Sequence, residues 1–168
     1  MITVAEDRLT SSEEAFGEWI VGRAASSLRL ARWILGDETS AEEAVQSAAL
    51  LAWRRRKDLR DPSAGDAWFN RILVNVCRTE LRRRGRQFVP PTVRDTYDPW
   101  QVRERDQELA VALGKLDDKE QVLLALRYGR ELTIPAIAQV LNVPDGTVKS
   151  RIHFALQHLR AALDAGRR

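Results

Sequence analysis

A cationic stripe is the strongest chemical signal in the chain. Between Trp53 and Arg86 there are eleven Arg or Lys residues against four Asp or Glu, a net charge of +7 over 34 residues. Four polar residues recur there at the spacing of one helical face: Arg71, Asn75, Arg78 and Arg82. Such a stripe binds phosphate groups or is simply solvated, and charge alone leaves both interpretations open. Trp53 and Trp68 flank the preceding loop, where aromatic rings favour contact with unpaired bases, although Trp68 is better explained as core.

A second pattern, from Thr133 to Leu156, fits two helices joined by a tight turn. Ala138 is small enough for the helices to cross closely, Asn142 tolerates the positive φ of the turn, and Val148 would pack the second helix onto the first. This pattern indicates a helix-turn-helix, whose second helix enters the major groove of DNA. Near the start of that helix we expect four exposed polar residues: Thr147, Lys149, Ser150 and Arg151. The competing interpretation is an ordinary helical hairpin with a solvated basic face.

The segments before the cationic stripe read as helices. The spacing of apolar residues predicts one helix from Ser11 to Leu35, ended by Gly36, because glycine adopts the left-handed conformation at little cost. The segment Ser40–Glu43 fits a capping box, in which serine and glutamate side chains satisfy the first free amides of a helix. That second helix is expected to end in the basic segment 53–57.

The stripe itself is predicted to lie on a long helix that a linker follows. Turn residues at 61–65 predict a loop, after which Asp66 is expected to cap a helix that runs to about Arg84. The helical pattern then stops, and Pro90-Pro91 and Asp98-Pro99 discourage helix. An irregular stretch of this length is unusual inside one compact domain, so it indicates an interdomain linker.

The helix-turn-helix belongs to a second helical unit that starts near Gln107. The segment Asp117–Glu120 resembles another capping box, and Gly129 is expected to end the helix that follows. Thr133 is placed to cap the next helix, and the last helix should begin after Pro144 and run toward Leu163. We therefore predict an all-α protein with two small helical domains, residues 12–86 and 107–165, joined by an irregular linker at 87–106.

The composition argues against several other classes of protein. One cysteine, Cys77, and two histidines leave no basis for a disulfide framework or a zinc site. The N-terminal residues lack the basic and apolar regions of a signal peptide, and no apolar run approaches the ~20 residues of a membrane span. No Gly-rich phosphate loop, metal-ligand cluster or nucleophile–base pair is visible. We expect a cytoplasmic protein that is not an enzyme, needs no cofactor or metal and does not insert into membranes.

Four blocks of the sequence, in order, resemble the extracytoplasmic-function (ECF) class of bacterial RNA polymerase sigma factors. The resemblance covers almost everything from about Phe16 to Leu163. The matching blocks are Leu35-Gly36-Asp37 with 40–46 and Ala52-Trp53-Arg54; 68–78 with Leu81-Arg82-Arg83-Arg84; 116–120 with Leu126-Arg127-Tyr128; and Ile137-Ala138 with 146–151. The resemblance implies a region 2-like helical bundle and a region 4-like helix-turn-helix, acting in promoter-specific initiation.

The resemblance also implies roles for individual residues. Glu42, Glu43 and Gln46 would dock on the clamp helices of the polymerase β′ subunit, and the β flap is a further expected contact. The −10 promoter element would be held by Arg56, Lys57, Arg60, Ser63, Arg71, Asn75, Arg78 and Arg82. The −35 element would be contacted by Thr147, Lys149, Ser150, Arg151 and His153. The linker would thread toward the RNA path of the polymerase, and an anti-sigma factor is an expected partner.

The chain departs from the family pattern at two places. Family members often carry arginines shortly after the Ser-Arg pair, where this chain has His153, Phe154 and Leu156, so the resemblance does not assign the −35 sequence preference. The segment 46–48 also lacks the usual acid and aromatic residue after the glutamine.

The alternative function is a stand-alone helix-turn-helix regulator, which would bind DNA without core polymerase.

Overall fold

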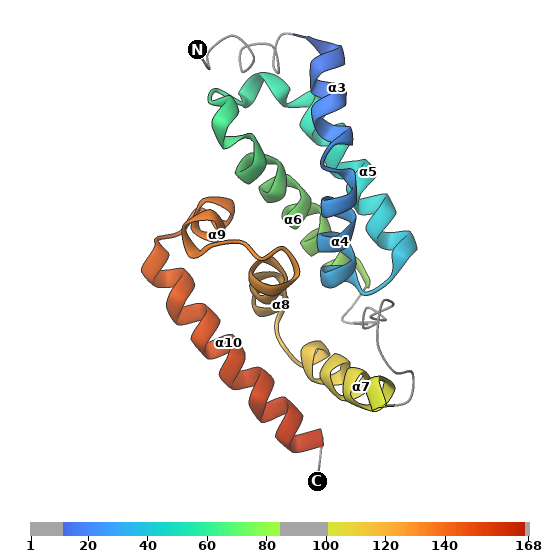
Figure 1. Ribbon diagram of the computed structural model, residues 1–168, viewed down its shortest axis with the longest axis vertical. Helices are drawn as coiled ribbons and strands as arrows, with labels where there is room; N and C mark the ends of the chain where they lie inside the picture. The colour runs from blue at the N-terminus through green and yellow to red at the C-terminus, as the bar shows by residue number, and fades with distance from the viewer. Residues whose placement is uncertain (1–11, 85–100, 167–168) are drawn as a thin grey trace.

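The computed structural model describes residues 12–84 and 101–166, and every regular element in these ranges is a helix (Figure 1). The N-terminal domain contains α3 (Glu13–Val21), α4 (Ala24–Leu35), α5 (Glu38–Arg54), η1 (Arg56–Asp58), η2 (Pro62–Ala64) and α6 (Gly65–Arg84). The C-terminal domain contains α7 (Gln101–Gly114), α8 (Asp118–Leu124), η3 (Ala125–Gly129), α9 (Ile134–Leu141) and α10 (Asp145–Gly166). The predicted all-α class with two small helical domains is confirmed.

Several helix ends are set by the local signals that the sequence carries. Gly36 ends α4 in the left-handed conformation, with a φ of 84°. Asp117 caps α8 in a full capping box, because its carboxylate accepts from the Glu120 amide and the Glu120 side chain accepts from the Asp117 amide. Thr133 caps α9. These three predictions are confirmed because each depends on groups within one helical turn.

The prediction of one helix from Ser11 to Leu35 is wrong, because the chain breaks into α3 and α4 at Gly22 and Arg23. Glycine is a weak helix former, and the backbone at Arg23 departs from ideal α-helical angles, with φ and ψ of −102° and −8°. The Arg23 guanidinium donates to the Trp19 carbonyl and to the Asp66 carboxylate of α6. The contact between Arg23 and Asp66 of α6 therefore favours the break between α3 and α4, although the spacing of apolar residues predicts one continuous helix.

The predicted capping box at Ser40 is also wrong. Helix α5 begins at Glu38, and its cap is Asp37, whose carboxylate accepts from the Ser40 amide at 2.9 Å and from the Ser40 hydroxyl at 2.6 Å. A carboxylate accepts more strongly than a neutral hydroxyl, and Asp37 precedes Ser40 by the three residues that a cap requires. Ser40 is thereby placed inside the first turn and is buried.

Asp66 does not cap α6, contrary to the prediction, because that helix begins one residue earlier at Gly65. Asp66 lies in the first turn, where its carboxylate binds Arg23 of the N-terminal helices. Gly65 is needed at the start because a Cβ there would lie 2.9 Å from the Trp19 ring. The start of α6 is thus fixed against α3.

Helix α7 begins at Gln101, within the segment predicted to be linker, and residues 85–100 lie outside the described part of the chain. In the C-terminal domain, α8 continues into the π-type turn η3, in which the Arg130 amide donates to the Ala125 carbonyl. Glu131 follows with a positive φ of 53°. No local signal predicted this wide turn, although Gly129 does end the helix as expected.

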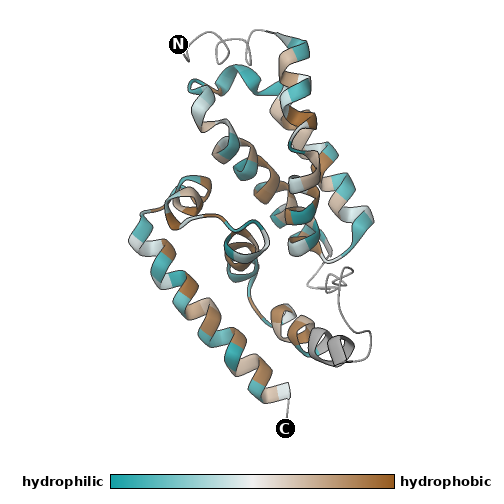
Figure 2. Cartoon of the chain, in the orientation of Figure 1, coloured by the Kyte–Doolittle hydropathy of each residue, from teal (hydrophilic) through white to brown (hydrophobic). Residues whose placement is uncertain are grey.

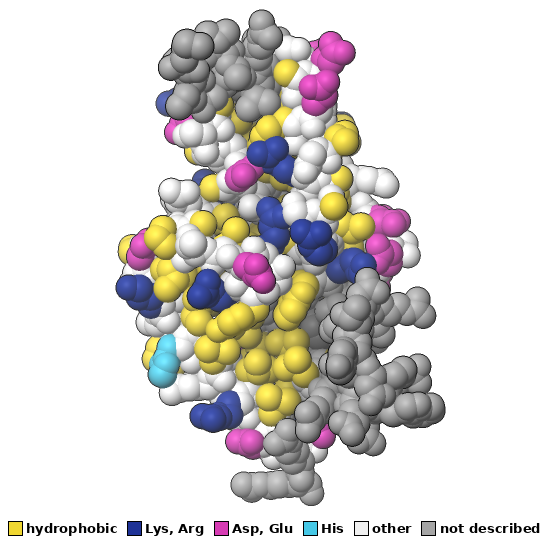
Figure 3. Space-filling model, in the orientation of Figure 1, with side chains coloured by type: hydrophobic (Ala, Val, Ile, Leu, Met, Phe, Trp, Pro, Cys, Tyr) yellow, Lys and Arg dark blue, Asp and Glu magenta, His cyan; other side chains and the backbone are white. Residues whose placement is uncertain are grey.

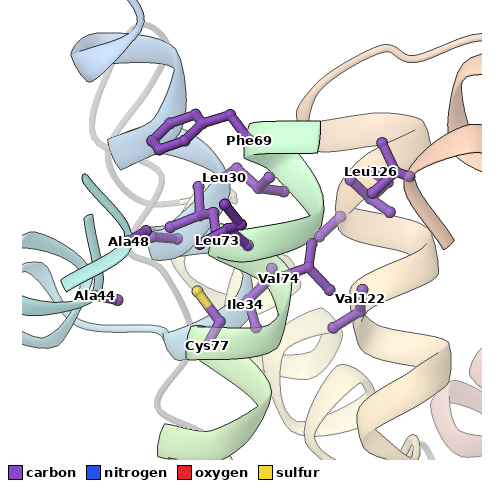
Figure 4. Close-up of a cluster of buried hydrophobic side chains, with 14 of the residues drawn as sticks. Leu30, Ile34, Ala44, Ala48, Phe69, Leu73, Val74, Cys77, Val122 and Leu126 are labelled. Atoms are coloured by element: carbon purple, nitrogen blue, oxygen red, sulfur yellow. The ribbon is translucent and has the colours of Figure 1, made fainter. Parts of the chain in front are cut away.

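The apolar sides of the helices form a core that continues from one domain into the other (Figure 2). Helix α6 is central, because it packs on α4 and α5 on one side and on α9 on the other. Figure 4 shows Val74 of α6 directed toward Val122 of α8, beside Ile34 of α4. A smaller apolar cluster, including Leu113 and Ala155, joins α7, α8 and α10.

Candidate nucleic-acid interface

The helix-turn-helix geometry is present at the predicted positions. Asn142 follows α9 in the left-handed region, with φ and ψ of 54° and 52°, and the Val143 amide then donates to the Ala138 carbonyl at 3.1 Å. Ala138 is 6% exposed and Val148 is fully buried where α10 packs on α9. The turn therefore holds the two helices by backbone geometry and by a small apolar contact.

The first turns of α10 present the predicted polar side chains. Lys149, Ser150 and Arg151 are exposed, and Thr147 is half-buried. The Ser150 hydroxyl donates to the Thr147 carbonyl at 3.1 Å, which leaves its oxygen free to accept. This end of α10 can therefore offer two cations and a hydroxyl to a duplex.

His153 and Phe154 occupy the positions where the family pattern often has arginine. Both are exposed, and their rings meet edge to face with centroids 5.7 Å apart. A His153 ring nitrogen lies 3.0 Å from the Gln157 amide nitrogen. Helix α10 thus presents two aromatic side chains at positions where members of the family often have arginine.

The stripe on α6 is formed as predicted, but the C-terminal domain lies against part of it. The Arg71 guanidinium donates to the carbonyls of Val140, at 3.1 Å, and of Gln139. Arg78 is half-buried, whereas Asn75 and Arg82 are exposed to solvent. The four residues therefore share one helix, and two of them face the other domain.

The loop before α6 is built from two short 3-10 turns. The Asp61 carboxylate accepts from the amide and hydroxyl of Ser63, at 2.9 and 2.7 Å, and the hydroxyl contact is the main reason that the pKa of Asp61 is lowered. Lys57, Arg60 and Ser63 are exposed. Arg56 is half-buried, because its guanidinium lies over the ring of Trp53. The loop therefore offers two free cations and a hydroxyl on a fixed turn.

Trp53 and Trp68 are both half-buried and pack against the core. The Arg56 guanidinium lies 4.2 Å from the centroid of the Trp53 ring, and Phe16 contacts the same ring at 5.8 Å between centroids. One face of Trp53 is therefore used for a cation–π contact. Neither indole is a free stacking surface in this conformation, as we expected for Trp68.

Helix α5 carries an exposed polar face that includes Glu42, Glu43 and Gln46. Leu50, one turn after Gln46, is 51% exposed. Sequence reasoning missed Leu50, since its neighbour Leu51 fits the apolar side of the helix equally well. An exposed leucine beside two carboxylates is suited to contact with another protein.

A groove of about 350 Å³ lies between α6 and the C-terminal domain. Arg78 of α6 and Arg151 of α10 both line it, together with Leu123, Leu141 and Phe154. These two arginines were predicted to read different promoter elements. The structure therefore brings residues of the two candidate DNA surfaces to one groove.

Between 12–84 and 101–166, no helix is long and apolar enough to span a membrane. Within the same ranges no cluster of three or more His, Cys, Asp or Glu side chains is arranged to hold a metal ion. Cys77 is buried, which raises the pKa of its thiol to about 12.

Both halves of the chain match established family models. Sigma-70 region 2 matches residues 23–87, and Sigma-70 region 4 matches residues 112–161. The ECF RNA polymerase sigma factor SigL of Mycobacterium tuberculosis is 30% identical over 143 residues, which cover 80% of this chain and 81% of SigL. SigM of the same organism is 33% identical over 139 residues, covering 80% and 70%. The RNA polymerase sigma-E factor of Streptomyces coelicolor is 29% identical over 154 residues, covering 89% and 86%.

Solved structures show the same arrangement of helices. CnrH, in complex with the cytosolic domain of CnrY, aligns with a TM-score of 0.72 at 27% identity, covering 96% of each chain. The sigma factor RpoE of Bartonella quintana, in complex with the anti-sigma factor NepR, aligns with a TM-score of 0.67 at 21% identity, covering 89% of this chain and 96% of RpoE. At 21% identity, the similarity to RpoE shows a shared fold and nothing further.

The chain belongs to the ECF class of RNA polymerase sigma factors. Proteins of this class act in transcription initiation, where they bind core polymerase and direct it to promoters, and this chain is a factor of that kind. Region 2 precedes region 4 along this chain, which is the order that their numbers give in sigma factors. The comparisons do not support the alternative of a stand-alone helix-turn-helix regulator.

Proposed function

We propose that α5 holds core polymerase while two cationic surfaces hold one promoter at two separate places. The observation that carries this proposal is the pairing of a formed helix-turn-helix, with Lys149 and Arg151 exposed on α10, with the Arg71–Arg82 stripe on α6. Each surface sits in a different family region. The linker between the domains limits the element spacings that one molecule can span.

In the duplex −35 element, the start of α10 enters the major groove. Lys149 and Arg151 contact phosphates or guanine edges, and Ser150 contacts a base or a phosphate. Thr147 and His153 lie at the border of this surface. The aromatic pair His153 and Phe154 replaces cationic contacts, so the sequence preference differs from that of arginine-rich relatives.

At the −10 element, the exposed residues of the loop 56–63 surround a base that leaves the duplex. Arg56, Lys57 and Arg60 supply donors around that base, the Ser63 hydroxyl oxygen accepts from it, and the α6 stripe holds the adjacent phosphates. Base flipping costs a few kcal/mol, which captured bases and polymerase contacts offset. No catalytic step is required of this chain, and we propose that it is not an enzyme.

Core polymerase is contacted through two protein surfaces. Glu42, Glu43 and Gln46, with Leu50 beside them, dock on the β′ clamp helices, where acidic residues suit a basic partner and repel DNA. The β flap docks on the C-terminal domain, where Figure 3 shows hydrophobic side chains gathered between α7 and α10. Because both partners are parts of the transcription machinery, the protein works in the cytoplasm.

An anti-sigma factor is the proposed inhibitor. RpoE of Bartonella quintana is bound by the anti-sigma factor NepR, and CnrH, which has the same fold, is bound by the cytosolic domain of CnrY. We propose that a protein of this kind covers the polymerase-binding and DNA-binding surfaces of this chain.

The proposal is tested by a gel shift with a promoter fragment, performed with and without core polymerase. We expect a stable shift only when both proteins are present, because the −10 strand is captured in the polymerase complex. Equal binding by the chain alone would contradict the proposal. A fragment with a scrambled −35 element is the matched control.

A further inference from the structure

Phe154 is an apolar residue on a side of α10 that faces solvent. It is 55% exposed, whereas Val148 and Ala155 of the same helix are buried and hold α10 against the rest of its domain. The ring of Phe154 therefore contributes little to the core. A single exposed apolar residue is ordinary on a protein surface, so its place on the helix decides what it can contact.

Phe154 shares one strip of α10 with Thr147 and Ser150. Their spacing of i, i+3 and i+7 puts the three residues on one face of the helix. Lys149 and Arg151 lie on either side of this strip, where cations are suited to phosphates. Because a helix rises about 1.5 Å per residue, Phe154 lies roughly 6 Å beyond Ser150 along the axis, which is nearly two base-pair steps. The strip is thus placed to face bases when α10 lies in the major groove.

Neighbouring side chains limit the rotation of the Phe154 ring. The His153 ring meets it edge to face, with centroids 5.7 Å apart and an interplanar angle of 68°. The Gln157 amide nitrogen lies 3.0 Å from Nε2 of His153, which ties that ring to the next turn of the helix. A side chain that is already ordered loses less conformational entropy on binding. Phe154 is therefore preorganised for contact with a ligand.

A phenyl ring on a recognition helix has one well-matched partner in the major groove. The base edges display hydrogen-bond donors and acceptors there, and the 5-methyl group of thymine is the apolar group among them. A phenyl ring that covers the cytosine amino group, or O6 and N7 of guanine, leaves these groups without a partner at a cost in free energy. Covering a methyl group is favourable, because apolar surface leaves water. Phe154 therefore favours thymine at the position that it covers.

We propose that Phe154 reads a thymine methyl group in the −35 element, so that the protein prefers a T·A pair facing the third turn of α10. This inference rests on the proposed role of α10 in binding the −35 duplex, and it adds the base that one residue selects. The loss of one methyl contact weakens binding by about fourfold. An arginine at the same place would instead pair with O6 and N7 of guanine.

Phe154 also borders the groove that Leu123 and Leu141 line, where an apolar side chain of a protein partner would meet the same ring. The hydroxyls on the strip and the cations beside it favour DNA as the ligand of this part of α10. Removal of one methyl group from the DNA separates the two ligands, because only a contact with the base responds to it.

Replacement of thymine by deoxyuridine tests the contact with the full chain bound to core polymerase. Promoter fragments with a randomised −35 element are first selected for binding to this complex. Each enriched thymine is then replaced by deoxyuridine, which lacks only the 5-methyl group. We expect one position at which deoxyuridine weakens binding by about fourfold, and at which 5-methyldeoxycytidine binds more tightly than deoxycytidine. Phe154→Ala should bind the thymine and deoxyuridine fragments equally.

A second variant changes the selected base. With Phe154→Arg, the selection should enrich guanine in place of thymine at that position, because the guanidinium donates to O6 and N7. Leu156→Ala is the matched control, since Leu156 is another exposed apolar residue of α10, 39% exposed, but residues two apart do not share a face. This control should keep the full difference between thymine and deoxyuridine.

Equal binding of the thymine and deoxyuridine fragments at every enriched position would overturn the role of Phe154. A difference between them that Phe154→Ala retains would do the same, and would show that the ring contacts something other than the base. In both cases, binding that still depends on the −35 sequence leaves the proposed function intact. If the unmodified complex binds a selected and a scrambled −35 element equally, the proposed function fails, and the role of Phe154 fails with it.

Discussion

Asn142 illustrates how one residue sets the geometry of the DNA-binding helix. It occupies the left-handed region at the end of α9, and its amide donates to the Ala138 carbonyl through the same turn. Asparagine tolerates this conformation better than most residues, because its short polar side chain can hydrogen-bond locally. The turn could be predicted from sequence for this reason, and its angle fixes where α10 starts.

Replacing Asn142 tests the role of this conformation. Asn142→Val should lower the free energy of unfolding by about 1–2 kcal/mol, because a β-branched side chain is strained at positive φ. Asn142→Gly should be nearly neutral, since glycine adopts the conformation freely. Urea denaturation of both variants measures the difference. Equal stability of the two would show that φ is not what selects asparagine.

The cations on α10 make a separate prediction for DNA binding. Lys149→Ala and Arg151→Ala should each reduce the slope of log affinity against log salt by about 0.9 if each contacts one phosphate. Binding of the polymerase complex to a −35 fragment, measured at several salt concentrations, gives this slope.

Lys115→Ala is the matched control for these variants, because Lys115 is exposed and follows α7, which lies beside the C-terminal part of α10 and not beside its first turns (Figure 1). Its slope should equal that of the unmodified chain. Slopes that stay unchanged in both α10 variants would show that these cations do not contact phosphates.

At the scale of elements, predictions succeeded where the deciding atoms are close in sequence. The capping box of α8 and the left-handed end of α4 each lie within one turn. The start of α5 was misjudged because Asp37 and Ser40 are both good caps, and only the structure shows which one accepts. The break between α3 and α4 depends on Arg23 binding Asp66, which are 43 residues apart. Local periodicity carries no information about such a contact.

The exposed face of α5 predicts a contribution from Leu50 to polymerase binding. Burying a leucine side chain is worth about 1.5–3 kcal/mol, so Leu50→Ala should weaken affinity for core polymerase by roughly tenfold. Stability should change little, because the side chain is 51% exposed. Titration of core polymerase with labelled protein measures the effect.

Val21→Ala is the control for the α5 surface, because Val21 is an exposed apolar residue, 73% exposed, on α3. It should bind core polymerase as tightly as the unmodified chain. If Leu50→Ala and Val21→Ala have the same affinity, the proposed docking surface on α5 is misplaced.

At the scale of the whole molecule, the sequence predicted which residues share a surface but not how the two surfaces sit relative to each other. The α6 stripe and the start of α10 follow from helical spacing alone. Their meeting in one groove depends on Arg71 reaching carbonyls almost 70 residues away and on Gly129 fitting against Trp33. Neither contact has a local signature, since arginine on a helix surface and glycine after a helix are both common. The position of η3 was missed for the same reason.

We propose that this chain directs core polymerase to promoters through two separate cationic surfaces. Run-off transcription on genomic DNA, with start sites mapped by sequencing, tests it most directly. We predict a distinct set of start sites when the chain is added to core polymerase, lost or strongly reduced with Arg151→Ala and with Arg82→Ala. Start sites identical to those of core polymerase alone would contradict this proposal.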